Sequence, residues 1–124
     1  MTRFGPGYAQ ELERLGRQFR RQLTRDAQQL LELESALVVG DDRRAALAAV
    51  RQLAHRLRGS AATFGEAEIG SMAGLLEEEA FGALQLDNRA LDLAAVGPSR
   101  HLLRELCILM GKSTSGLLSS AQSD

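Results

Sequence analysis

The residue of this chain best suited to chemistry is His55, which stands four positions before a glycine, Gly59. An imidazole can act as a nucleophile near neutral pH, and the direction of a side chain on a helix follows from the sequence pattern. A projection at about 100° per residue places His55 roughly 120° from the centre of an apolar stripe. That stripe consists of Leu47, Val50, Ala54, Leu57 and Ala61. We therefore expect His55 to point into solvent.

Gly59 has no evident structural purpose on the outer face of a helix. Glycine inside a helix costs roughly 1 kcal/mol relative to alanine, and no packing on that face offsets the cost. A tolerated substitution is one explanation. The other is that a partner's backbone or a transferred group must come close to His55, where a side chain would obstruct it. Ser60 and Ala62 have small side chains, so the surface around Gly59 carries little bulk.

Arginines make this helix basic within a nearly neutral chain. Arg51 and Arg58 each lie about one turn from His55, where they can attract an anion to the ring. The natural anion is a phosphoryl group or an acidic pocket on a partner. Arg44 and Arg56 need be no more than parts of a solvated face.

The next helix offers a carboxylate to orient the ring. A carboxylate that holds one imidazole N–H fixes the tautomer and makes the other nitrogen more nucleophilic. Glu77 lies at the edge of an apolar stripe, whereas Glu78 and Glu79 lie further round or on the opposite flank. A run of acidic residues on its own usually marks only a solvent-exposed face of a helix. The stripe consists of Ile69, Met72, Leu76, Ala80 and Ala83.

Apolar-striped helices with short connections must position these groups. We expect helices from Tyr8 to Val39, from Asp41 or Asp42 to Phe64, from Glu66 to Ala83 and from Pro98 to about Ser119. Gly16 and Thr24 weaken the first stretch, which is either one curved helix or two, and residues 88–96 are compatible with a short helix. The predicted fold class is all-α: an antiparallel four-helix bundle with an additional N-terminal helix or helical extension.

Length, charge and cysteine content restrict the classes of function. The chain has 124 residues, enough for one domain, and its formal net charge of -1 argues against bulk electrostatic binding to nucleic acid or an anionic membrane. No apolar run is long enough to span a bilayer and no leader pattern follows Met1, so we expect a cytoplasmic protein. Cys107 is the only cysteine, and its apolar neighbours predict a core position in a reducing compartment.

The stretch from Ala54 to Ala61, followed by Phe64 and Gly65, resembles the signature of histidine-containing phosphotransfer domains. In that family the stretch reads His-x-Leu-(Lys/Arg)-Gly-Ser, and an apolar residue and a glycine close the helix. The resemblance extends from about residue 19 to residue 118 and includes Glu77 on the following helix. We accordingly divide the chain into an N-terminal helical extension (1–18), a four-helix phosphotransfer bundle (19–119) and a flexible tail (120–124).

The resemblance implies a function and a role for each residue. His55 would carry a phosphoryl group between aspartates of receiver domains in a two-component phosphorelay. Arg58 would take the place of the family's frequent lysine and position phosphate or partner, and Glu77 would orient the ring. The partner-binding positions would be Arg51, Gly59 and Ala62.

The same resemblance implies a stoichiometric phosphocarrier and not an enzyme. Its partners would be receiver domains of response regulators and of hybrid sensor histidine kinases, which would supply Mg²⁺, since the chain would have no cofactor or metal of its own. We expect a monomer.

Three other classes of protein share some of these features. A helical adaptor that binds a partner without phosphate chemistry fits the composition equally well, but it does not explain Gly59 beside an outward His55. A metal site could draw on His55, His101, Glu105 or Cys107. His101 and Glu105 are four apart on a helix, yet no second His or Cys lies close in sequence to either histidine. A kinase dimerisation domain also presents a helical histidine, and it would need an ATP-binding domain after it.

Overall fold

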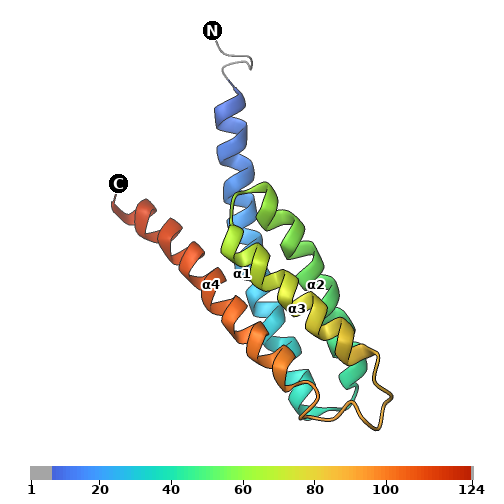
Figure 1. Ribbon diagram of the computed structural model, residues 1–124. Helices are drawn as coiled ribbons and strands as arrows, with labels where there is room; N and C mark the ends of the chain where they lie inside the picture. The colour runs from blue at the N-terminus through green and yellow to red at the C-terminus, as the bar shows by residue number, and fades with distance from the viewer. Residues whose placement is uncertain (1–6, 124) are drawn as a thin grey trace.

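The protein folds into four helices, and the predicted all-α class is confirmed (Figure 1). The computed structural model describes residues 7–123, and the side chains of residues 7–114. Within that range there is no strand. The helices are α1 (Tyr8–Val39), α2 (Arg43–Thr63), α3 (Ala67–Leu84) and α4 (Gly97–Ser123).

Each helix packs against two neighbours, so that the four surround one core. Within the described residues, α1 and α3 both pack directly against α2 and α4, whereas the backbones of the two diagonal pairs lie further apart across the core. Successive helices run in opposite directions (Figure 1). This arrangement is the predicted antiparallel bundle. Its largest fully buried apolar side chains are Leu23, Leu30, Leu37, Leu47, Leu57, Leu76, Leu103, Leu106 and Met110.

The ends of α1 and α2 follow from residues that the sequence already marks. Gly40 has a φ of 80° and Gly65 a φ of 71°, the left-handed conformation that a glycine adopts without strain. The Asp42 side chain caps the start of α2 by accepting a backbone N–H three residues later, at 3.0 Å. After α2, the Glu66 N–H donates to the Ala61 carbonyl at 2.9 Å, the 6→1 bond of a Schellman motif.

The segment between α3 and α4 holds turns in place of the short helix that the sequence allowed. Asp87 accepts the backbone N–H of Ala90 at 2.8 Å, and Asp92 accepts that of Ala95 at 2.9 Å. Each aspartate closes a single turn, because its side chain competes with the backbone for the same N–H groups.

Arg44 ties this segment to the start of α2, which corrects its interpretation as part of a solvated face. Its guanidinium donates to the Leu84 carbonyl at 2.8 Å and to the Asn88 side chain at 2.8 Å, and it also bonds the Leu86 carbonyl. The Leu84 carbonyl, at the end of α3, has no partner within its own helix, and Arg44 satisfies it.

Helix α1 is continuous in spite of Gly16 and Thr24. Its first turns project beyond α2 and α3 (Figure 1), so Leu12 is exposed although it continues the apolar stripe. Residues 8–18 of the predicted extension therefore belong to the same helix as the bundle residues that follow, and residues 1–6 lie outside the described range. At the other end, α4 continues to Ser123, beyond the expected end near Ser119.

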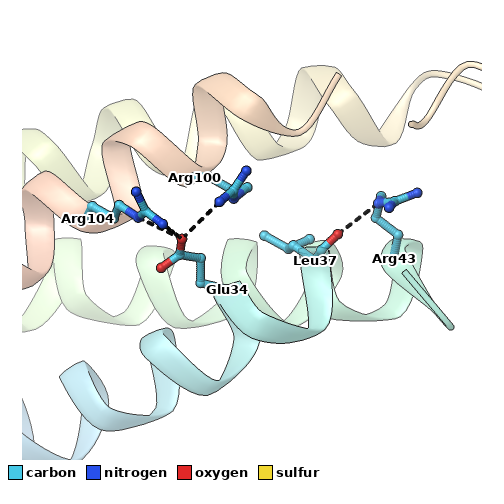
Figure 2. Close-up of polar contacts among 5 residues, drawn as sticks. All are labelled: Glu34, Leu37, Arg43, Arg100 and Arg104. Carbon is cyan, nitrogen blue, oxygen red and sulfur yellow. Dashed lines mark hydrogen bonds and ion pairs between the residues drawn. The ribbon is translucent and has the colours of Figure 1, made fainter. Parts of the chain in front are cut away.

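A buried acid on α1 fixes the position of α4. The side chain of Glu34 is only 11% exposed and receives the guanidinium of Arg104 at 2.7 Å and that of Arg100 at 3.4 Å (Figure 2). Arg43, at the start of α2, donates at 2.9 Å to the Leu37 carbonyl in the last turn of α1 (Figure 2). Arginines of α4 and α2 thus bind α1 at two neighbouring points near its end, one at the Glu34 carboxylate and one at a backbone carbonyl.

A second buried acid joins α1 to α2 and corrects the interpretation of Arg56. The side chain of Asp26 is 3% exposed, accepts from Arg56 at 2.8 Å and from Gln22 at 2.9 Å. Near the end of α2, the Phe64 ring stacks on Phe19 of α1 with ring centroids 4.8 Å apart. These contacts hold α2 firmly against α1 on the side away from α3.

Candidate functional site

His55 lies in the middle of α2 and points away from the core. Its side chain is 73% exposed, whereas its neighbour Ala54 and the predicted apolar stripe are buried. The outward direction predicted from helical periodicity is therefore confirmed. The buried polar contact of the adjacent Arg56 fixes this stretch of helix on one side.

Glu77 of α3 meets the ring. Its Oε2 lies 2.6 Å from Nδ1 of His55, and its own side chain is only 15% exposed. Glu78 is exposed, and among the described side chains neither Glu78 nor Glu79 bonds the ring. The structure thus brings together the histidine and the glutamate that the sequence singled out from three candidates.

Arg58 holds the other oxygen of the same carboxylate. Its Nη1 donates to Glu77 Oε1 at 3.0 Å. The Arg58 side chain reaches it by passing over Gly74, where an added Cβ would lie 3.5 Å from Arg58 Cδ. Gly70, one turn earlier on α3, faces α2 at Ala61 in the same way. The small residues of α3 therefore allow α2 to pack close enough for these contacts.

The charge of Glu77 follows from these two partners. Burial alone would raise the pKa of the Glu77 carboxyl, but the hydrogen bonds from His55 and Arg58, with their charges, outweigh burial and hold that pKa below its usual value. At neutral pH Glu77 is therefore a carboxylate, which can only accept hydrogen bonds.

A pocket opens beside the ring, toward the start of α2. It has a volume of about 290 Å³ and is lined by Arg51, Gln52, His55 and Glu77. The guanidinium carbon of Arg51 lies 4.7 Å from the centre of the Phe81 ring, a cation–π contact. Sequence reasoning did not single out Gln52 or Phe81. Phe81 follows Glu77 by one helical turn, and that spacing was the only available signal.

The surface one turn after His55 is open. Gly59 is exposed, and a Cβ built there would have no atom within 4 Å apart from its own helix backbone and chain neighbours. Ala62 is exposed on the same helix. No internal contact of the described residues requires a glycine at position 59, so backbone is left bare beside the histidine.

A comparison with protein families decides what this arrangement belongs to. The family model of the Hpt domain matches residues 8–110, which is most of the chain. The chain belongs to the Hpt domain family. Searches among curated proteins and among solved structures found no match.

Membership gives this Hpt domain its general function. Hpt domains take part in phosphotransfer within phosphorelays, interact there with receiver domains, and are phosphocarriers rather than classical enzymes. The family match starts at residue 8, within the segment assigned to the N-terminal extension, and α1 is continuous through it. The division at residues 18 and 19 stays a prediction.

The remaining candidates of the sequence lie apart from this site. Among the described residues of the Hpt domain no three His, Cys, Asp or Glu side chains lie together as metal ligands, and His101 and Glu105 are both exposed on α4. Cys107 is half-buried against α1, and burial, assisted by the charge of Glu34, raises the pKa of its thiol to about 11. None of the described helices is both long enough and apolar enough to cross a membrane.

Proposed function

We propose that His55 is the phosphoacceptor of this Hpt domain, and that it exchanges a phosphoryl group with aspartates of receiver domains. The observation that carries the proposal is the 2.6 Å contact between Nδ1 of a largely exposed imidazole and a largely buried carboxylate. Such a contact orients the ring from behind and leaves its other edge accessible.

The contact also selects the reactive nitrogen. Glu77 is ionised and can only accept, so the Nδ1 of a neutral His55 carries the proton and Nε2 carries the lone pair. Nε2 attacks the phosphorus of an aspartyl phosphate, the P–O bond to the aspartate breaks, and the aspartate leaves as a carboxylate. The ring then bears phosphate on Nε2, a proton on Nδ1 and a positive charge next to Glu77. The reverse step returns the phosphoryl group to an aspartate.

Glu77 therefore has two roles in this proposal. It fixes the tautomer before the reaction, and it stabilises the positive charge that develops on the ring during the reaction. Arg58 keeps the carboxylate ionised and aimed through its 3.0 Å bond to Oε1. We assign Arg58 to the orientation of Glu77 first and to positioning of the partner second.

Part of the catalysis comes from the partner in this proposal. Phosphoryl transfer depends on in-line positioning and on neutralisation of the three equatorial oxygens. We propose that the receiver supplies the phosphorylated aspartate and Mg²⁺, while this domain, acting as a monomer, supplies the oriented imidazole. The bare backbone at Gly59 and the small side chain of Ala62 would let the receiver surface approach the ring.

The test is transfer from phosphorylated receiver domains of the same genome. We expect acid-labile label on the wild-type chain and none on His55→Gln, with the helical circular dichroism of both proteins equal. Label that persists in His55→Gln would contradict the assignment. Binding of a receiver without any uptake of phosphate would favour the helical adaptor instead.

A further inference from the structure

We propose that Arg51, and not Arg58, is the cation that binds the phosphoryl oxygens when His55 is phosphorylated. This inference rests on the proposed function of His55. It adds a phosphate-binding residue to that site, at a position one turn before the histidine on α2.

Arg58 is already committed to another anion. Its guanidinium bonds Glu77 at 3.0 Å, and that carboxylate also holds the ring. If Arg58 turned to the phosphate, Glu77 would lose the partner that helps to keep it ionised and aimed. Arg58 thus neutralises the charge of Glu77, the carboxylate that bonds the reacting ring. A second cation is needed for the incoming phosphate.

Arg51 is the cation that is free to move. Among the described side chains it contacts no carboxylate, and its guanidinium rests on the exposed Phe81 ring at 4.7 Å. An exposed cation–π contact is weak, whereas a guanidinium binds phosphate through two parallel charge-assisted hydrogen bonds. The stronger ligand therefore displaces Arg51 from Phe81.

The pocket beside the ring lies on the Arg51 side. Arg51, Gln52, His55 and Glu77 line it, and Arg58 does not. Its volume of about 290 Å³ exceeds that of several water molecules and accommodates a phosphoryl group on the ring. The Gln52 amide offers a further donor at the pocket wall. The geometry therefore gives phosphate a polar recess next to an uncommitted guanidinium.

The test uses phosphoramidate, a small phosphate donor, so that the result does not depend on docking of a receiver. We compare the full-length wild type with Arg51→Gln and Arg51→Lys. Arg89→Gln is the control, because it removes the same charge far from His55. Arg89 lies next to Asn88, which Arg44 binds at the start of α2. Arg44 is eleven residues from His55, or about 16 Å along a helix. The readouts are the rate of labelling and the ³¹P chemical shift of the phosphohistidine as a function of pH.

An adjacent guanidinium favours the doubly ionised phosphoryl group. We expect Arg51→Gln to raise the pKa of the phosphoryl group by about half a unit and to slow labelling by up to about fivefold, as for loss of a largely exposed ion pair. Arg51→Lys should recover part of both effects, and Arg89→Gln should show neither.

The outcomes separate this inference from the function on which it rests. If His55 is labelled and Arg51→Gln titrates like Arg89→Gln, the assignment of Arg51 is wrong and the proposed function stands. If the wild type takes no label at residue 55 from either phosphoramidate or a receiver, both are wrong.

Discussion

Replacement of Glu77 by glutamine removes the charge behind the imidazole and keeps the shape of the side chain. The amide oxygen of glutamine can still accept from Nδ1 of His55, but it brings no negative charge to meet the positive ring that forms during transfer. Its amide group would also face Arg58, which donates to Oε1 at 3.0 Å. We therefore expect a folded protein that accepts phosphate more slowly.

The magnitude follows from the exposure of the two partners. A hydrogen bond to a charged group contributes about 1.5–3 kcal/mol when it is buried, and an exposed ion pair contributes about 0.2–1 kcal/mol. Here Glu77 is 15% exposed and His55 is 73% exposed, so the pair lies between these limits. A loss of about 1 kcal/mol of transition-state stabilisation corresponds to a rate about fivefold slower.

The assay is the initial rate of labelling by phosphoramidate, followed on gels that retard the phosphorylated protein. The matched control is Glu78→Gln, which makes the same change in charge at the exposed neighbouring residue. Circular dichroism verifies that both variants are folded. Equal rates for Glu77→Gln and Glu78→Gln would refute the claim that the Glu77 carboxylate supports the ring.

Four further predictions concern stability and access. Because the pKa of Glu77 is lower in the folded protein, its ion pairs stabilise the fold above the usual carboxyl pKa near 4.5, and this stabilisation is lost as the pH falls below that value. The free energies of unfolding of wild type and Glu77→Gln, measured in urea, should therefore converge in acid. Arg56→Gln leaves the buried Asp26 with one partner fewer and should destabilise by about 1–2 kcal/mol in urea, less than for a fully buried pair because Arg56 itself is half-exposed. Gly59→Ala should raise the free energy of unfolding by up to about 1 kcal/mol in the same assay, since a Cβ there meets nothing. Gly59→Gln should slow transfer from a receiver and leave the rate of phosphoramidate labelling unchanged. Cys107, with a thiol pKa of about 11, should react with iodoacetamide far more slowly at pH 8 than it does in the urea-unfolded chain.

Local signals in the sequence predict the helices and their ends. Gly40 and Gly65 occupy left-handed positions, and Asp42 caps α2, because each of these residues satisfies a backbone requirement that depends on its immediate neighbours alone. The outward direction of His55 follows from helical periodicity in the same way. The predicted buried stripe of α3 is less accurate, because tertiary packing decides which residues at its edge are covered. Met72 is only half-buried, and the adjacent Ala73 takes the fully buried position.

The partners of the buried acids could not be predicted, because they come from other helices. On a helical projection Glu34 falls within the apolar stripe of α1, one turn after Leu30, but nothing near it in sequence indicates Arg100 and Arg104. The pair of Asp26 and Arg56 spans 30 positions in the same way. A carboxylate is buried only where a cation reaches it, and that depends on how the helices pack.

The candidate site was predicted in part. The spacing of apolar residues placed Glu77 at the edge of α3, but only the packing of α2 against Gly70 and Gly74 brings it within 2.6 Å of the ring. Helical spacing treated Arg51 and Arg58 alike, as cations one turn from the histidine, and the family resemblance alone assigned phosphate or partner positioning to Arg58. The structure separates them, since Arg58 pairs with Glu77 and Arg51 rests on an aromatic ring.

The most direct test of the account is the position of the phosphoryl group on the imidazole ring. Long-range ¹H–¹⁵N correlation NMR of the ¹⁵N-labelled, phosphorylated protein distinguishes the two ring nitrogens. We predict phosphate on Nε2 of His55, with a protonated Nδ1 still bonded to Glu77. Phosphate on Nδ1, or on any residue other than His55, would contradict the claim that Glu77 holds one edge of the ring and presents the other for reaction.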